Sequence, residues 1–195
     1  MGVNGKILTA AILASGNGSN AENILQYAAQ FPKKIKIPLV ITDNKNAGVI
    51  MRARALGVPC AVVEREGNRA AQEEKIIALL KSHSVDWIFL AGYMAILSPV
   101  FVDQWRGRIV NIHPSLLPQF PGRDGYGDAF RANVATSGVT LHFVDEGIDT
   151  GPVILQKEFS RSPEDTLESF RARGMALEYQ LYREFINNLI KEAAA

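Results

Sequence analysis

Short apolar segments recur along the first part of the chain, and segments of helical composition separate them. Continuous apolar runs of this length are typical of strands that are covered on both faces. The alternation predicts an α/β fold, a Rossmann-like and mostly parallel sheet with helices on both faces. The strands are expected at residues 7–14, 35–42, 60–63, 86–91 and 109–113.

Helix-end signals mark the segments between these strands. Gly57 follows a helix expected at 46–56, and Asn68 is placed to cap a helix at 69–82. Ser162, with Pro163 in the first helical position, is expected to open the last helix. The remaining helices are expected at 21–28, from 98 onward and at 124–133.

The pattern changes after Gly122. Residues 138–144 alternate between apolar and polar side chains, and residues 153–159 are expected to form the next strand. Two consecutive strands with two different faces predict antiparallel strands in the C-terminal part of the sheet. No linker interrupts the chain, so residues 1–195 are expected to form a single domain.

Composition excludes several classes of partner. A formal net charge of +1 gives no reason to expect nucleic acid or an anionic membrane surface. The longest apolar stretch, 87–97, is shorter than the roughly 20 residues that a spanning helix needs. The single cysteine, Cys60, excludes an internal disulfide and is typical of a reducing compartment. We therefore expect a cytoplasmic protein with no membrane segment.

A glycine-rich turn follows the first strand. Gly16, Gly18 and Ala21 match the dinucleotide-binding spacing, and Asp43 follows the next strand where a ribose-binding acid belongs. The same turn can instead hold a single terminal phosphate, because unpaired N–H groups at a helix start bind anions. Ser19 and Asn20 can cap the helix and add donors. A βα turn without any ligand is the third interpretation.

The strand at 109–113 ends in an amide and an imidazole. Asn111 and His113 are two residues apart, so their side chains leave an extended strand on the same face, and Pro114 ends the strand. Such a pair suits a reaction that develops charge on a carbonyl oxygen. A lone histidine in this position more often satisfies a backbone carbonyl, so further residues must support the functional interpretation.

Ligands of parallel α/β sheets bind at the carboxyl ends of the strands. This rule places the glycine turn, residues 92–97 and the Asn111–His113 pair along one edge of the sheet. The three histidines, His83, His113 and His142, have no metal-ligand spacing, so no metal is expected. His142 is expected to be buried beside the site rather than catalytic.

Four sequence blocks, at 14–20, 90–94, 111–118 and 142–152, carry a family resemblance. With these blocks the chain resembles the phosphoribosylglycinamide formyltransferases, folate-dependent enzymes of purine biosynthesis. The resemblance runs from the glycine turn to the last helix and implies the formyltransferase fold. It also favours a monophosphate rather than a dinucleotide at the glycine turn.

The resemblance implies a reaction and a set of roles. The formyl group of 10-formyltetrahydrofolate, a co-substrate, would pass to the amine of glycinamide ribonucleotide. Asn111 and protonated His113 would stabilise the oxyanion, while Asp149 keeps His113 protonated and aids proton transfer. The substrate phosphate and ribose would be bound by Gly18, Ser19, Asn20 and Glu178. The folate would be bound by Arg69, Met94, Ala95, Ile96, Leu97, Asp145, Glu146, Gly147 and Ile148.

Some positions depart from the best-known bacterial pattern of this family. Ala95 stands in place of an arginine, and Arg183 in place of a proline. Asp124 and Tyr126 replace two histidines after the Pro-Gly pair. These departures concern the substrate loop and folate affinity rather than the chemistry.

Two other functions stay open on the sequence alone: a nicotinamide-dependent oxidoreductase that uses the glycine turn and Asp43, and a non-catalytic phosphate- or folate-binding protein. The expected partners are the two small-molecule substrates, without nucleic acid or membrane, in a monomer or homodimer. The N-terminal half, to about residue 105, is expected to bind phosphate, and the half from about 106 to carry folate binding and catalysis.

Overall fold

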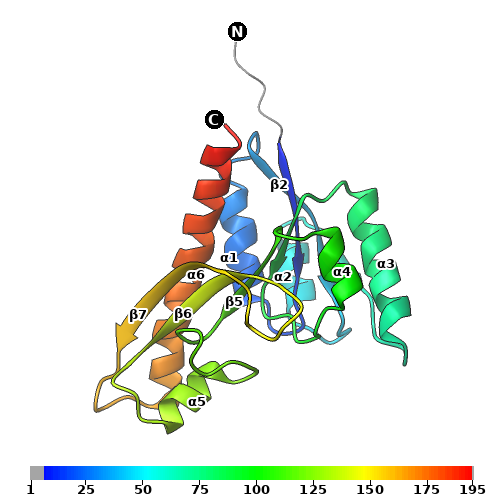
Figure 1. Ribbon diagram of the computed structural model, residues 1–195. Helices are drawn as coiled ribbons and strands as arrows, with labels where there is room; N and C mark the ends of the chain where they lie inside the picture. The colour runs from blue at the N-terminus through cyan, green and yellow to red at the C-terminus, as the bar shows by residue number, and fades with distance from the viewer. Residues whose placement is uncertain (1–6, 195) are drawn as a thin grey trace.

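A computed structural model describes residues 7–194 and contains a seven-stranded sheet with helices packed on both faces (Figure 1). The strand order is β3-β2-β1-β4-β5-β6-β7, parallel through β5 and antiparallel at β6 and β7. The strands are β1 (Leu8–Leu13), β2 (Ile35–Thr42), β3 (Cys60–Val62), β4 (Trp87–Leu90), β5 (Ile109–His113), β6 (Thr136–Phe143) and β7 (Val153–Ser160). The predicted mixed α/β sheet is confirmed.

Six helices connect or follow these strands within the described residues. They are α1 (Ser19–Ala28), α2 (Val49–Ala55), α3 (Arg69–Ser82), α4 (Pro99–Gln104), α5 (Gly125–Arg131) and α6 (Leu167–Glu192). The helix at 69–82 and its Asn68 cap are confirmed, because the Asn68 side chain accepts a hydrogen bond from the Ala70 N–H. Among the described residues, no helix is both long and apolar enough to cross a membrane.

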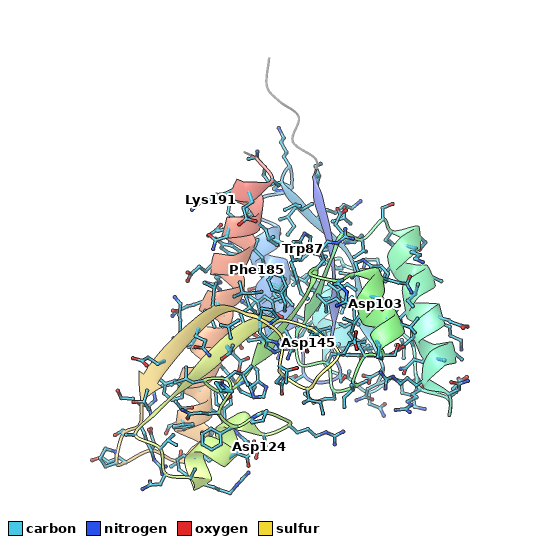
Figure 2. All side chains as sticks on the ribbon, viewed as in Figure 1. Trp87, Asp103, Asp124, Asp145, Phe185 and Lys191 are labelled. Atoms are coloured by element: carbon cyan, nitrogen blue, oxygen red, sulfur yellow. The ribbon has the colours of Figure 1, made fainter. Side chains whose placement is uncertain are left out.

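A separate hydrophobic core lies on each face of the sheet. On one face α1, α2, α5 and α6 cover the apolar side chains of the strands, and α3 and α4 cover the other face. Trp87 of β4 packs edge-on against Phe185 of α6, with ring centroids 5.7 Å apart (Figure 2). The long helix α6 is thereby fixed across the sheet, and its buried face also carries Glu178.

The last helix begins at Leu167, so the predicted start at Ser162 is wrong. Thr166 and Ser169 form a reciprocal capping box at its N-terminus. Residues 162–165 form a turn instead, in which the Asp165 carboxylate accepts from the Ser162 N–H at 2.7 Å and pairs with Arg173. Asp165 therefore closes a turn before the helix.

Two other helix starts also differ from the expectation. Gly18 occupies the N-cap position of α1 in a left-handed conformation, so Ser19 and Asn20 lie in the first turn rather than capping it. The helix expected from Asn46 begins at Val49, because the Asn44 side chain accepts from the Asn46 N–H and forms a turn. Both starts are shifted by local turn geometry.

Candidate active site

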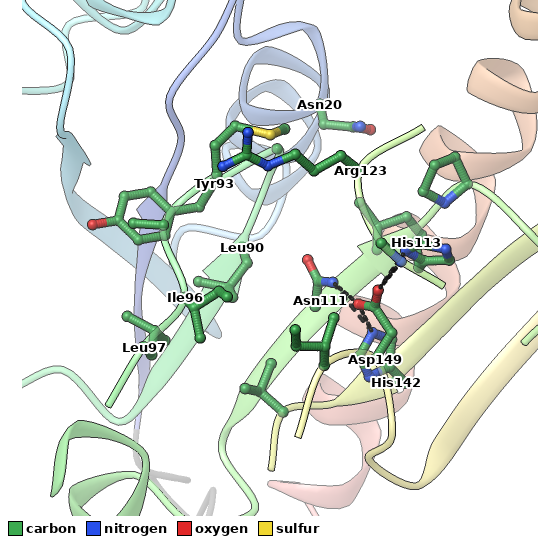
Figure 3. A pocket seen from close by; sticks show the side chains of 18 of the residues that line it. Asn20, Leu90, Tyr93, Ile96, Leu97, Asn111, His113, Arg123, His142 and Asp149 are labelled. Atoms are coloured by element: carbon green, nitrogen blue, oxygen red, sulfur yellow. Dashed lines mark hydrogen bonds and ion pairs between the residues drawn. The ribbon is translucent and has the colours of Figure 1, made fainter. Parts of the chain in front are cut away.

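A pocket with a volume of about 490 Å³ lies at the carboxyl ends of β4 and β5 (Figure 3). Five segments line it: the loop after β4, the end of β5, the segment at 122–126 that leads into α5, the loop after β6 and the facing side of α6. Asn20 of α1 completes the wall. The predicted position of the site at this edge of the sheet agrees with the structure.

His113 is buried in the wall of this pocket, with 3% of its surface exposed. Its Nδ1 lies 3.3 Å from Asp149 Oδ2, and its Nε2 lies 2.8 Å from the carbonyl oxygen of Phe120. Both partners are hydrogen-bond acceptors. The two contacts are satisfied together only when both ring nitrogens carry hydrogen, which is the cationic form of the imidazole.

Asp149 joins His113 to Asn111. Its Oδ2 accepts a hydrogen bond from the Gly122 N–H at 2.8 Å, and its Oδ1 lies 3.5 Å from Asn111 Nδ2. Burial raises the pKa of this carboxyl, but the hydrogen bond from the Gly122 N–H and the charge of His113 outweigh it, so the pKa lies below its usual range. The carboxylate is therefore ionised at neutral pH.

His142 orients the amide of Asn111. Antiparallel pairing of β5 with β6 sets these two residues opposite each other. His142 Nδ1 lies 2.8 Å from the Phe143 carbonyl, so it carries the hydrogen, and in the neutral ring Nε2 accepts from Asn111 Nδ2 at 3.2 Å. The expectation that His142 is buried beside the site agrees with its 2% exposure.

The glycine turn is held against α2 and against the loop after β4. A Cβ at Gly18 would overlap Val49, so only glycine fits this left-handed position. Arg52 Nε donates to the Asn17 carbonyl at 2.9 Å, and Ser15 Oγ accepts from the Met94 N–H at 2.9 Å. The turn is thereby fixed beside the pocket, although Gly18 and Ser19 themselves do not line it.

Three side chains from different elements meet at the α6 wall. The buried Glu178 accepts one hydrogen bond from Asn20 at Oε2 and one from the Tyr126 hydroxyl at Oε1, the latter at 2.5 Å. The Asn20 Oδ1 atom is buried and has no hydrogen-bond partner within the described part of the chain. This wall therefore offers a carboxylate and an unused acceptor to a ligand.

Two loops give the pocket an apolar mouth. Met94, Ile96 and Ile148 are each more than half exposed there. Large apolar side chains that stay exposed at a pocket suit a flat, aromatic ligand. Ala95, Leu97, Asp145 and Gly147, all expected in the folate site, also line the pocket.

Two residues predicted for the folate site lie outside the pocket lining. The Arg69 guanidinium is 3.2 Å from the Glu73 carboxylate, which in turn accepts the Ser98 N–H at 2.7 Å. Glu146 pairs with Arg106 at 3.3 Å. Arg69 therefore contacts the loop at 94–97 only through Glu73 and Ser98.

The lining also includes Arg123, Tyr126 and Met175, which were not predicted as site residues. The Arg123 side chain extends toward the side of the pocket that carries Tyr93 (Figure 3) and forms no ion pair within residues 7–194. Its place directly after Pro-Gly is the only signal in the sequence. Tyr126 and Met175 depend on how α5 and α6 pack together. No group of three or more potential metal ligands occurs in the described residues.

Comparison with known proteins identifies similar sequences and structures over nearly the whole chain. The formyl transferase family profile matches residues 8–186. A phosphoribosylglycinamide formyltransferase of Bacillus subtilis is 43% identical over 182 residues, covering 92% of this chain and 93% of that protein. A second, from Haemophilus influenzae, is 39% identical and covers 88% of this chain and 82% of its own length.

Solved structures give the same result. The crystal structure of phosphoribosylglycinamide formyltransferase from Bacillus halodurans has a TM-score of 0.89 and 42% identity, with 95% of this chain and 96% of that chain covered. At this identity and coverage, the comparison of sequences and the comparison of structures indicate the same family.

Proposed function

The chain belongs to the formyl transferase family, and on that premise we propose that it transfers a formyl group from 10-formyltetrahydrofolate to the amine of glycinamide ribonucleotide. The products are formylglycinamide ribonucleotide and tetrahydrofolate, in purine biosynthesis. The relatives carry this activity in their names and match almost all of the chain. The support for the reaction itself, beyond membership of the family, comes from the side chains that line the pocket.

The single observation that carries the proposal is one carboxylate in contact with both an amide and an imidazole. Asp149 lies within 3.5 Å of Asn111 Nδ2 and of His113 Nδ1, in the wall of a pocket large enough for a small ligand. Acyl transfer to an amine needs both oxyanion donors and a proton acceptor, and these three side chains supply them.

Asn111 and His113 act on the developing oxyanion. When the amine attacks the formyl carbon, the carbonyl oxygen becomes negative, and preorganised N–H donors stabilise it. The second N–H of Asn111 has only the long contact with Asp149 and is available to this oxygen. When substrate binds, the Nε2–H of His113 gives up its hydrogen bond to the Phe120 carbonyl and donates to the developing oxyanion instead.

Asp149 has an electrostatic role and a proton-transfer role. Its negative charge, 3.3 Å from His113 Nδ1, favours the cationic imidazole. As the new nitrogen–carbon bond forms, the amine gains positive charge and gives up a proton. The bond from the formyl carbon to the folate nitrogen then breaks, and that nitrogen takes the proton, relayed by Asp149 directly or through water.

The start of α1 binds the substrate phosphate. Gly18, Ser19 and Asn20 present the unpaired N–H groups of a helix N-terminus, where the helix dipole favours an anion. A local site of this kind is needed because the chain's net charge is only +1. Glu178, within contact of Asn20, accepts hydrogen bonds from the ribose hydroxyls.

The apolar mouth binds the pterin ring of the folate. Backbone groups of residues 94–97 and 145–148 contact the ring, while Met94, Ile96 and Ile148 cover it. Because these contacts are made by the backbone, Ala95 can replace an arginine without loss of the site. Arg69 contacts the carboxylate tail of the folate outside the pocket, beside the Glu73–Ser98 link.

We also propose that the chain acts as a single domain in the cytoplasm, as a monomer or homodimer. Its N-terminal half, to about residue 105, supplies the phosphate site, and the half from about 106 supplies the catalytic groups. No metal takes part in the proposed reaction, because Asn111 and His113 supply the electrophilic stabilisation.

The test is turnover by the purified chain. Glycinamide ribonucleotide is added to the protein with 10-formyltetrahydrofolate, and the absorbance of the released folate is followed. We expect turnover with the ribonucleotide and no binding of NADH. Folate binding without turnover would leave only a binding protein, and NADH binding would favour the oxidoreductase.

A further inference from the structure

Tyr126 contacts Glu178, the acid assigned above to the ribose. The phenol hydroxyl donates to Glu178 Oε1 at 2.5 Å, and Asn20 Nδ2 donates to the other carboxylate oxygen. Each carboxylate oxygen can accept two hydrogen bonds, so each keeps one acceptor site for a ligand. The carboxylate is therefore held by two donors from α1 and α5 while remaining able to bind hydroxyl groups.

Gly174 makes the space for this phenol. It lies one turn before Glu178 on the buried face of α6, and a Cβ there would overlap Cε1, Cζ and the hydroxyl oxygen of Tyr126. Glycine is unfavourable in a helix interior, so the close approach of the Tyr126 ring accounts for its presence at this position.

Phe170 fixes the ring from the other side. Its ring is perpendicular to that of Tyr126, with centroids 6.4 Å apart and an interplanar angle of 88°. Phe170, Gly174 and Glu178 follow at intervals of four residues, which is one face of α6. The tyrosine therefore lies along this face, with one position for its hydroxyl.

The phenol acts as a donor at neutral pH. Burial raises the pKa of the Tyr126 hydroxyl, and the nearby charge of Glu178 raises it further. A protonated phenol can satisfy Glu178 without adding charge.

We propose that Tyr126, in the space left by Gly174, is a positioning residue that holds Glu178 toward the ribose hydroxyls and sets the preference for substrates that carry them. This inference rests on the proposed function, because it assumes a ribonucleotide at the α6 wall. The unused Asn20 Oδ1 beside the carboxylate supports a hydroxyl-bearing ligand there.

The test compares binding of glycinamide ribonucleotide with binding of its analogue lacking both ribose hydroxyls. Calorimetry gives the dissociation constants, and steady-state kinetics gives KM and kcat. In Tyr126→Phe we expect the Kd and KM of the ribonucleotide to rise about tenfold, since a hydrogen bond to a charged group is lost. Binding of the analogue, the folate KM and kcat should be unchanged.

Tyr182→Phe is the matched control. The Tyr182 hydroxyl is also buried on α6 and donates to the Leu90 carbonyl at 2.6 Å, but it forms no hydrogen bond with Glu178. This variant should lose stability without any change in ribose discrimination. Gly174→Ala perturbs the same contact from the other side, because the added methyl group displaces the phenol, and should reproduce the loss of discrimination.

The outcomes separate the two proposals. Unchanged ribose discrimination in Tyr126→Phe, or an equal loss in Tyr182→Phe, would overturn the role of Tyr126. A wild-type chain that binds the ribonucleotide but does not turn over would refute the proposed function, while the calorimetric comparison would still decide the role of Tyr126. A wild-type chain that binds the analogue as tightly as the ribonucleotide would overturn the inference.

Discussion

Replacement of Asp149 by asparagine tests the electrostatic core of the proposed mechanism. The change keeps the size of the side chain and an oxygen that can accept from the Gly122 N–H. It removes the negative charge 3.3 Å from His113 Nδ1 and leaves a neutral amide oxygen there, because Nδ1 and the Gly122 N–H contact the same oxygen, Oδ2. Without the opposite charge, the cationic form of the imidazole loses the electrostatic support of the carboxylate.

The magnitude follows from the geometry. Two unit charges 3.3 Å apart attract by roughly 5 kcal/mol at an effective dielectric constant of about 20. The cost of holding the carboxylate away from water offsets part of this attraction, since only 12% of the Asp149 side chain is exposed. A net value of about 1.5–3 kcal/mol, typical of a charge-assisted hydrogen bond, predicts a kcat about 10- to 150-fold lower.

The assay is steady-state formyl transfer at neutral pH with both substrates saturating. Asp103→Asn is the control, because it makes the same change in an exposed carboxylate that pairs with Arg106 away from the pocket. We expect the control to keep the wild-type kcat. If Asp149→Asn matches the control, the carboxylate does not support catalysis, and the proposed role of His113 as a cation is refuted.

The same variant gives a prediction for stability. The pKa of Asp149 is lowered by folding, so its contribution to the free energy of unfolding is present above the unfolded pKa and lost as pH falls through the folded pKa. The wild type should therefore exceed Asp149→Asn in stability at neutral pH, and the difference should shrink below about pH 4. Urea unfolding at several pH values measures it; a difference that grows toward acid pH would contradict the sign.

Three further predictions concern other positions. Asn111→Ala should lower kcat by about 10²–10³-fold, as for other lost oxyanion donors, with an unchanged circular dichroism spectrum; near-normal turnover would exclude the amide from the mechanism. Gly151→Ala should lower the free energy of unfolding by about 1–3 kcal/mol, because a methyl group would overlap the Phe143 carbonyl. Its control is Gly16→Ala, where a methyl group meets no atom within 4 Å and which should unfold in urea like the wild type. Arg123→Ala should raise the KM of the anionic ribonucleotide and weaken its dependence on salt; an unchanged KM at low salt would show that this cation does not contact the substrate.

Local signals in the sequence predicted most of the fold. The strand at 109–113 and the helix at 69–82 have the predicted bounds, because apolar runs and the Asn68 cap act within a few residues. The predicted start of α6 was wrong because two possible capping residues, Ser162 and Thr166, follow one another closely. The first of them forms a turn, in which the Asp165 carboxylate accepts from the Ser162 N–H and pairs with Arg173, eight residues away.

The site was predictable to the extent that it depends on one strand. The two-residue spacing of Asn111 and His113 predicted a shared face, and both contact Asp149. Asp149 itself entered only through the family resemblance, since nothing local links the loop after β6 to the end of β5. Arg69 was placed at the folate by resemblance, whereas in the structure its guanidinium is held by Glu73.

The sequence by itself therefore determined the alternating α/β pattern, the amide–imidazole pair and the glycine turn, because periodicity, capping and backbone freedom are properties of neighbouring residues. Only the tertiary structure decided which distant groups meet. The register of β5 with β6 set His142 against Asn111, and the packing of α5 on α6 brought Tyr126 to Glu178. Such contacts arise from how whole elements pack, and no short stretch of the chain encodes them.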